Sequence, residues 1–338
     1  KIKIVAVLAV VMLFGIFNVS LSPISAQNKG SPECRVKVPT SEIDARRSLR
    51  PTKEDHSDTL GILRVLVVRV GFPDIDTSSL TKEELESAVF TGKYSLNSYV
   101  KEVSENRAEI TGKVLDGWYV MPENASYYGY DGDQDLYDFV VNGVIPIIDP
   151  EVDFNDFDRV ILVLSGKWSG YGSIGKWTCR TDDGDDLKIS WARINSSDIS
   201  DQTTYYVLIH EFFHNLGRRH TGGMKNREGE CEYCDDYETD EDARGDECYI
   251  SEYWNKDVMG NEMTQISMRL KENLGWTNKD QILTVEKSST VILTQREIQA
   301  EGIKAIKVFA EMENGYKKYY IFELFCPLGL FDSLLGNK

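Results

Sequence analysis

The chain has 338 residues, of which 41% are hydrophobic and 28% are charged, and its formal net charge at pH 7 is −17. This length fits one large domain, or one domain with a smaller one beside it, and the composition is that of a globular protein. The negative charge argues against nucleic acid as a partner, because a phosphate backbone would be repelled. The charge identifies no substrate, and the oligomeric state stays open.

The first 26 residues are predicted to form a secretory signal peptide. Lys1 and Lys3 supply the positive start, residues 4–17 are almost wholly apolar, and Ser25-Ala26 offers a cleavage point of small residues. The apolar run is shorter than the ~20 residues that span a bilayer, and no other segment is long and apolar enough to do so. We therefore expect a secreted, extracellular protein without stable membrane insertion after cleavage. An uncleaved anchor is the alternative.

Residues 27–59 are polar and lack apolar periodicity, so they are expected to be a linker or a propeptide, with Arg46-Arg47 as one place to cut it. Outside the cell, the six cysteines are expected to pair as disulfides, in a pattern that the sequence does not determine. They are Cys34, Cys179, Cys231, Cys234, Cys248 and Cys326.

The main folded domain is expected over residues 60–278. Its predicted strands, recognised by β-branched runs or alternating polarity, are 62–70, 108–120 (a strand pair or meander), 159–164 and 187–194 (an edge strand). Its predicted helices are 81–90 (with Thr81 and Glu84 as a capping box), 95–103, 135–144 (ended by Pro146) and 203–216. Strands interleaved with helices indicate an α/β or α+β domain with a mixed sheet.

After Trp276 the pattern changes to short β-type segments at 281–293, 303–309 and 319–325, with turn residues such as Asn314-Gly315 between them. A small all-β unit is therefore expected over residues 279–338. The chain stops soon after the last of these segments, so truncation within this unit is one interpretation.

Three of the four histidines lie in one stretch of the last predicted helix, HEFFHNLGRRH. His210 and His214 are four residues apart, so a helix places them on one face, where both imidazoles can reach one tetrahedral zinc ion. Glu211 is rotated away from the ligands and can take a proton from a zinc-bound water as that water attacks a carbonyl group. The pattern predicts a hydrolytic zinc site.

A third ligand is predicted at His220. Gly217 stands where a helix needs a left-handed residue to end, and beyond it the chain can turn back. A continued helix would carry His220 too far along its axis to reach the same metal. A chance HExxH motif is the alternative, and the register of Gly217 and His220 argues against it.

HEFFHNLGRRH resembles the metzincin signature HExxHxxGxxH at every fixed position. The resemblance implies a metzincin-like fold with a twisted mixed sheet and an active-site helix. It also implies a Met-turn, a methionine-containing bend beneath the metal, and WNKDVMG is similar to that turn. Met259 would then be a structural residue and not a ligand.

The chain is also similar to the secreted peptidases of the immune inhibitor A type. The similarity is carried by LRVLVVRVGFPD, SLNSYVKEVSENRAEITGKVLDGWYVMPENASYYG, DFNDFDRVILVLSG, DVMG, ENLGW and YYIFELFCPLGLFDSLL. Two departures matter. No tyrosine follows Met259 closely, so no oxyanion role is assigned to a tyrosine. The acidic loop before Met259 carries three cysteines, so substrate preference is not carried over from this group.

Calcium is the second candidate cofactor. Asp131, Asp133 and Asp135 present carboxylates at alternate positions, which suits calcium, although Leu136 in the glycine position excludes an EF-hand. A solvated acidic turn is the alternative, and residues 182–186 are a weaker candidate of the same kind. Cys34 is better explained by a disulfide than by a thiol switch on zinc.

The sequence therefore predicts a secreted zinc endopeptidase that acts on protein or peptide substrates. Its metal ligands would be His210, His214 and His220, and Glu211 would be the general base. The alternative is a non-catalytic surface adhesin or calcium-binding structural protein on the same fold, against which the intact Glu211 speaks. The cleavage preference, the natural substrate and the activation step stay open.

Overall fold

The computed structural model describes eleven stretches of the chain, which form two compact units. The larger unit comprises residues 51–277 and 326–338, and the smaller unit comprises residues 1–50 and 278–325. The described stretches are 34–38, 58–77, 80–128, 139–180, 186–199, 205–218, 258–260, 264–287, 289–313, 316–325 and 330–331.

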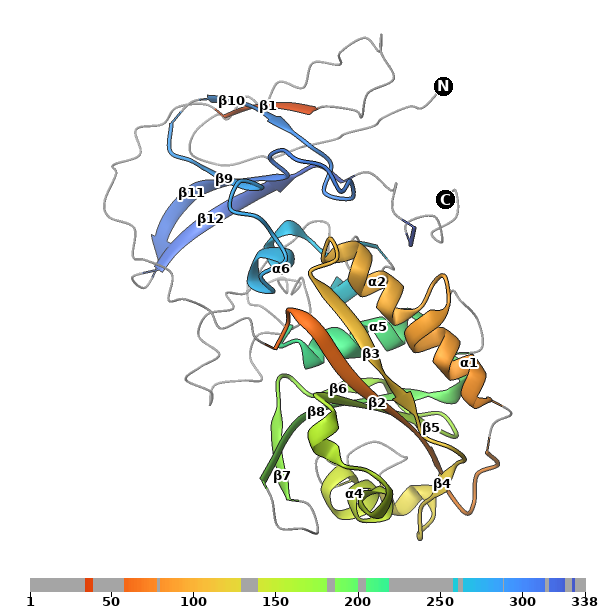
Figure 1. Ribbon diagram of the computed structural model, residues 1–338. Helices are drawn as coiled ribbons and strands as arrows, with labels where there is room; N and C mark the ends of the chain where they lie inside the picture. Colours follow the sequence, from red (N-terminus) through yellow and green to blue (C-terminus); the bar gives the residue numbers. More distant parts are fainter. Residues whose placement is uncertain are drawn as a thin grey trace. The chain divides into compact units, whose positions relative to one another are not determined.

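The larger unit is built on a mixed sheet of seven strands (Figure 1). Its strands are β2 (Gly61–Gly71), β3 (Ala108–Val114), β4 (Tyr119–Val120), β5 (Arg159–Leu164), β6 (Tyr171–Gly172), β7 (Trp177–Arg180) and β8 (Asp186–Asn195). The order is β3-β2-β5-β8-β6, with β4 pairing with β2 and β7 pairing with β8. β2, β3, β4, β5 and β8 run parallel, whereas β6 and β7 are antiparallel to β8.

Helices cover both faces of this sheet, as Figure 1 shows. The α-helices are α1 (Lys82–Glu86), α2 (Leu96–Val103), α4 (Ile145–Ile148), α5 (Tyr205–Asn215) and α6 (Met268–Asn273). Short 3-10 or π turns cover Ser87–Thr91, Ala125–Tyr128, Val140–Val144, Asp149–Glu151, Phe154–Asp156, Ser196–Ile199 and Val258–Gly260. Among the described residues, none of the helices has the length and apolar character needed to span a bilayer.

The apolar run at residues 65–68, in the middle of β2, follows from the position of this strand between two layers. Leu63, Val65 and Val67 belong to the core that also contains residues of α1, α2, α5 and α6. Leu66 and Val68 point the other way, into the core that contains residues of α4. Because alternate residues of a strand face opposite sides, a strand segment covered on both sides is expected to be apolar on both, as Val65, Leu66, Val67 and Val68 are. The predicted mixed sheet with helices is confirmed at this level.

Three local predictions for this unit are wrong. Residues 108–120 do not form a strand pair or meander, because β3 and β4 each pair in parallel with β2 and not with one another. The strand predicted at 187–194 is not an edge strand, because β8 has β5 on one side and β6 and β7 on the other. Pro146 does not end a helix, because the helical turn Val140–Val144 continues directly into α4, in which Pro146 lies.

The predicted capping box at the start of α1 is confirmed. Thr81 Oγ1 accepts from the backbone N–H of Glu84 at 3.2 Å, and the Glu84 carboxylate accepts from the backbone N–H of Thr81 at 2.8 Å. Replacing Thr81 by Ala removes the oxygen that accepts from the backbone N–H of Glu84, so we expect the free energy of unfolding to fall by about 1 kcal/mol. Urea unfolding of Thr81→Ala measures this, with Thr81→Ser as the control that keeps the cap. Equal stability of the two variants would contradict the prediction.

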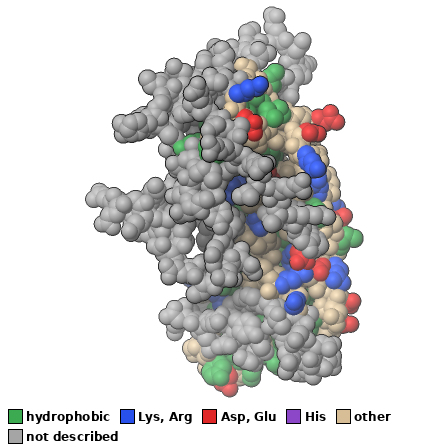
Figure 2. All heavy atoms as spheres, turned by 90° about the vertical axis from the view of Figure 1, so that its left-hand side faces the viewer, with side chains coloured by type: hydrophobic (Ala, Val, Ile, Leu, Met, Phe, Trp, Pro, Cys, Tyr) green, Lys and Arg blue, Asp and Glu red, His purple; other side chains and the backbone are tan. Residues whose placement is uncertain are grey.

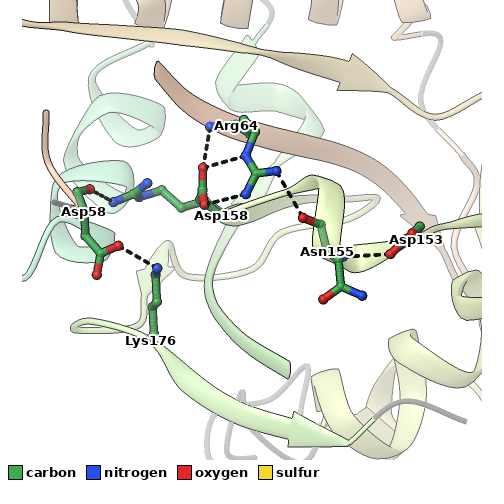
Figure 3. A network of polar contacts seen from close by, with 7 residues as sticks. Asp58, Arg64, Asp153, Asn155, Asp158 and Lys176 are labelled. Atoms are coloured by element: carbon green, nitrogen blue, oxygen red, sulfur yellow. Dashed lines mark hydrogen bonds and ion pairs between the residues drawn. The ribbon is translucent and has the colours of Figure 1, made fainter. Parts of the chain in front are cut away.

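The amino ends of β2 and β5 are joined by charged side chains (Figure 3). Arg64 of β2 makes a two-pronged contact with Asp158, whose carboxylate oxygens lie 3.0 and 3.1 Å from its Nη2 and Nε. Arg159, which is 1% exposed, donates to the carbonyl oxygen of Asp58. The Asp58 carboxylate in turn lies 2.6 Å from Lys176 Nζ. These contacts fix the chain just before β2.

The points where the chain enters and leaves the larger unit are also bonded to one another. Thr59 Oγ1 donates to the carbonyl oxygen of Leu274 at 2.9 Å, and Trp276 Nε1 donates to the carbonyl oxygen of Thr59 at 2.7 Å. Trp276 is fully buried against Phe213 of α5, with ring centroids 5.7 Å apart. Residues 58–59 and 274–276 therefore lie side by side, although more than 200 residues separate them in the sequence.

Near its C-terminal end the chain contributes residues 330–331 to the core that also contains Trp276. Phe331 is fully buried, with its ring 5.0 Å from that of Tyr99 and 5.9 Å from that of Tyr94. The backbone N–H of Leu330 donates to the Glu102 carboxylate at 3.1 Å. Residues 330–331 thus pack with α2 and not with the all-β unit in which the sequence placed them.

The described residues of the smaller unit form mainly β-strands. Its strands are β1 (Cys34–Val38), β9 (Ile282–Val285), β10 (Ser289–Leu293), β11 (Ala305–Glu313) and β12 (Tyr316–Glu323). β9, β11 and β12 form one sheet in the order β12-β11-β9, and β1 pairs antiparallel with β10. β1 lies inside residues 27–59, which the sequence suggested as a linker or propeptide, so part of that segment is a strand of this unit.

Figure 2 shows one face of the molecule, and the described residues on this face carry charges of both signs. Basic and acidic side chains are interspersed there. Exposed ion pairs such as Lys82 with Asp116, 2.8 Å apart, and Lys101 with Glu109 are examples of this mixing in the larger unit. A net charge of −17 is therefore compatible with local pairing on the surface.

Candidate metal centre

α5 carries His210, Glu211 and His214 on an otherwise apolar helix. Leu208, Ile209, Phe212 and Phe213 are fully buried and belong to the core between α5 and the sheet. The three polar side chains are 7–8% exposed, so the helix is buried along its polar face as well. The two imidazole rings lie 5.0 Å apart with an interplanar angle of 83°. The predicted helix and the shared face of the two histidines are confirmed.

The hydrogen bonds of the two imidazoles determine their tautomers. His210 Nδ1 lies 2.8 Å from the carbonyl oxygen of Val258, and His214 Nδ1 lies 2.6 Å from the carbonyl oxygen of Arg218. A carbonyl oxygen can only accept, so in both rings Nδ1 carries the proton and Nε2 carries the lone pair. Tyr206 Oη is a second neighbour of His210 Nδ1, at 2.9 Å. Histidines that bind metal through Nε2 are held by contacts of this kind.

The end of α5 supplies one of these carbonyl groups. Gly217 has a φ of +77°, as its predicted role in ending the helix requires. Its N–H donates to His214 O at 2.8 Å, and the N–H of Arg218 donates to Phe213 O at 3.1 Å. This is the Schellman arrangement of a helix terminus. The turn brings the carbonyl group of Arg218 back toward the ring of His214.

Glu211 is a buried carboxyl group beside these histidines. Burial raises its pKa to about 8; the positive charge of Arg193 opposes this shift and the negative charge of Asp198 adds to it. A cation bound beside Glu211 would lower its pKa again. Without a bound cation the neutral form of Glu211 is therefore favoured at neutral pH, whereas a nearby cation would favour the carboxylate.

Met259 lies in the short 3-10 turn Val258–Gly260, with 1% of its surface exposed. It packs in the same core as α5. The carbonyl group that accepts from His210 belongs to the residue just before it. The turn is therefore next to the first histidine, where the resemblance placed a structural methionine.

Other predicted site residues lie outside the described part of the chain. These are His220, the candidate calcium ligands Asp131, Asp133 and Asp135, and the cysteines of the acidic loop. Within the described residues, no group of three or more His, Cys, Asp or Glu side chains is placed to hold a metal ion. Of the three histidines predicted to bind zinc, two therefore lie in the described part of the chain. The calcium site stays a prediction.

The sequence did not reveal the neighbours that complete the site. Tyr206 could have been found, because it stands four residues before His210 on the same helix face. Val258 O, Arg193 and the loop before β6 are distant in sequence, and no spacing rule connects them to α5. Gly170 of this loop and Gly172 of β6 approach α5 closely. A Cβ atom on Gly170 would lie 2.4 Å from Glu211 Oε1, and one on Gly172 would lie 2.3 Å from Glu211 O.

Comparison with known proteins adds no family. Models of known protein families give no match to this chain, and no curated protein matches it either. The evidence for function is therefore the sequence motif together with the geometry of α5 and its neighbours.

Proposed function

We propose that this protein is a zinc-dependent endopeptidase, secreted from the cell, which hydrolyses peptide bonds of protein or peptide substrates. The observation that carries the proposal is the pair of Nδ1 contacts. His210 and His214 both direct Nδ1 at a backbone carbonyl group, which leaves both Nε2 atoms in the form that binds zinc. Two histidines one helical turn apart, in this tautomer and beside a carboxyl group, suit zinc and hydrolysis.

The residues present fit zinc as the resident metal. His210 and His214 would hold it, with His220 as the third ligand from the sequence motif. When bound, zinc would supply a Lewis acid that polarises a water molecule and the scissile carbonyl group. Glu211 would accept the proton of the attacking water and deliver it to the nitrogen of the leaving amine. The resemblance of HEFFHNLGRRH and of the turn at Met259 supports a metzincin-like site.

Zinc removal and return test the proposal. Purified protein is expected to hold one zinc per chain and to cleave an unfolded protein substrate. Dialysis against a chelator should abolish cleavage, and one equivalent of zinc should restore it. The protein could bind stoichiometric zinc and still cleave no unfolded protein, even after the residues before the folded domain have been removed. That result would favour a non-catalytic adhesin on the same fold. A proteome-derived peptide digest would report the cleavage preference.

Tyr206 offers a separate test of how His210 is held. Tyr206→Phe removes the hydroxyl group 2.9 Å from His210 Nδ1 but leaves the carbonyl group of Val258 in place. Partners of this type contribute about 10- to 100-fold in metal affinity, and we expect the lower figure because one partner remains. Zinc competition with a chromophoric chelator measures the affinity. Tyr205→Phe, on the same helix, is the control, and an equal loss in both variants would contradict the role of Tyr206.

A further inference from the structure

The loop between β5 and β6 is held in place by β8, and one of its anchors is Asn195. Asn195 contacts the backbone of Trp168 on both sides: its Oδ1 accepts from Trp168 N, and its Nδ2 donates to Trp168 O at 2.6 Å. The indole Nε1 of Trp168 donates to the carbonyl oxygen of Ser165 at 2.8 Å. The first half of this loop, which covers residues 165–170, is thus fixed by side-chain contacts.

The second anchor is Arg193, two residues before Asn195 on β8. Its Nε donates to the carbonyl oxygen of Ser169 and its Nη2 to Ser169 Oγ, each at 3.2 Å. The guanidinium carbon lies 5.5 Å from the ring centroid of Trp168. Arg193 is 8% exposed, so it is a buried cation whose hydrogen bonds are directed at one loop residue.

Gly170, which follows Ser169 in the loop, faces the carboxyl group of Glu211. A Cβ atom on Gly170 would lie 2.4 Å from Glu211 Oε1 and 3.1 Å from Glu211 Cδ. The backbone of Gly170 is therefore in direct contact with the carboxyl group. The same Cβ atom would lie 3.0 Å from Val207 Cγ1 of α5. Gly170 forms one wall of the space in which the Glu211 side chain can rotate.

We propose that Arg193 is a positioning residue for Glu211. By holding Ser169 it keeps the backbone of Gly170 against the Glu211 carboxyl group, and this contact restricts the orientations that the carboxyl group can take. The inference rests on the proposed function, because a general base must be held in one direction relative to its proton donor. A misplacement of about 1 Å costs about 100-fold in rate when groups must be aligned.

Arg193→Met tests this role, because it keeps an unbranched apolar side chain and removes both donors. We expect kcat to fall about 100-fold, with the zinc content unchanged, and we expect Arg193→Lys to recover part of the loss because it keeps one donor. If Arg193 acts through Glu211, the same substitution in a Glu211→Gln background should cause little further loss. Equal losses in both backgrounds would overturn the proposal.

Gly170→Ala changes the contact between Gly170 and Glu211 directly. It is the alternative variant if Arg193→Met fails to fold. The added methyl group must displace the Glu211 carboxyl group, so kcat should again fall while both histidines still bind zinc. Gly71→Ala is the matched control, since its Cβ atom would meet the Thr77 side chain at 3.0 Å at the end of β2. Unchanged kcat in Gly170→Ala would overturn the proposal.

A crystal structure separates this inference from the proposed function. In Arg193→Met, the backbone of Gly170 should have moved away from Glu211, whether or not the protein hydrolyses peptides. If the contact is unchanged, the positioning role is wrong even for an active enzyme. If the wild type binds zinc but cleaves nothing, the proposed function fails, and the movement of Gly170 still decides the role of Arg193.

Discussion

Replacing Glu211 by Gln is expected to reduce peptide hydrolysis by about 100- to 10,000-fold, the range that a positioned general base contributes. The amide has the size of the carboxyl group and cannot accept a proton. Zinc binding should persist, because both histidines keep their Nδ1 contacts with Val258 O and Arg218 O. The measurement is kcat/KM on a fluorogenic peptide, together with zinc content by mass spectrometry.

The stability of this variant provides a second readout. Burial raises the pKa of Glu211 to about 8, so the fold without metal favours an uncharged side chain at this position. A neutral amide should therefore leave the melting temperature of the metal-free protein unchanged or raise it. Glu86→Gln is the matched control, because Glu86 is an exposed residue of α1 and the chemical change from carboxyl to amide is the same. Hydrolysis at the wild-type rate in Glu211→Gln would disprove the mechanism.

Phe331→Ala should lower the free energy of unfolding of the larger unit by about 3–5 kcal/mol, the usual cost of deleting a fully buried aromatic side chain. Phe331 is buried between Tyr94 and Tyr99, with both ring pairs close to perpendicular. The substitution would leave a cavity beside α2 in the core that also contains α5. Chemical denaturation followed by tryptophan fluorescence measures the change, because Trp276 belongs to the same core.

Tyr127→Ala is the control for this experiment, since Tyr127 is 64% exposed and its removal should change stability by less than about 0.5 kcal/mol. A similarly small effect for Phe331→Ala would show that the C-terminal segment does not stabilise the core. We also expect removal of residues after 325 to cost more than Phe331→Ala alone, because the bond between Leu330 N and Glu102 is then lost as well.

The helix of the candidate site was predictable because its chemistry is local. The spacing of His210 and His214 and the position of Gly217 depend only on helix geometry, and the structure has the helix, the shared face and the positive φ. The contacts that orient these groups are different in kind. Val258 is 48 residues from His210, and the partners of Glu211 come from another strand and its loop. Only folding brings such groups together.

The same distinction explains the fold. Strands such as Arg159–Leu164 were found within a residue or two, since β-branched runs report burial of a single strand. Which strands pair, and in which direction, depends on the path of the chain between them. For that reason β3 and β4 were mistaken for partners of one another, although both lie alongside β2. Strand existence is a property of a segment, whereas pairing is a property of the whole sheet.

The hydrogen bonds between Thr59 and residues 274–276 suggest how one domain of this chain could have been inserted into another. Between them lie all but the final segment of the larger unit, while strands of the smaller unit occur on both sides, β1 before it and β9 after it. This main part of the larger unit is thus an insertion whose two ends meet, the arrangement that lets one domain be added within another without separating the strands of its host. Deleting residues 58–277 and joining the flanking segments would show whether β1 and β10 still pair on their own.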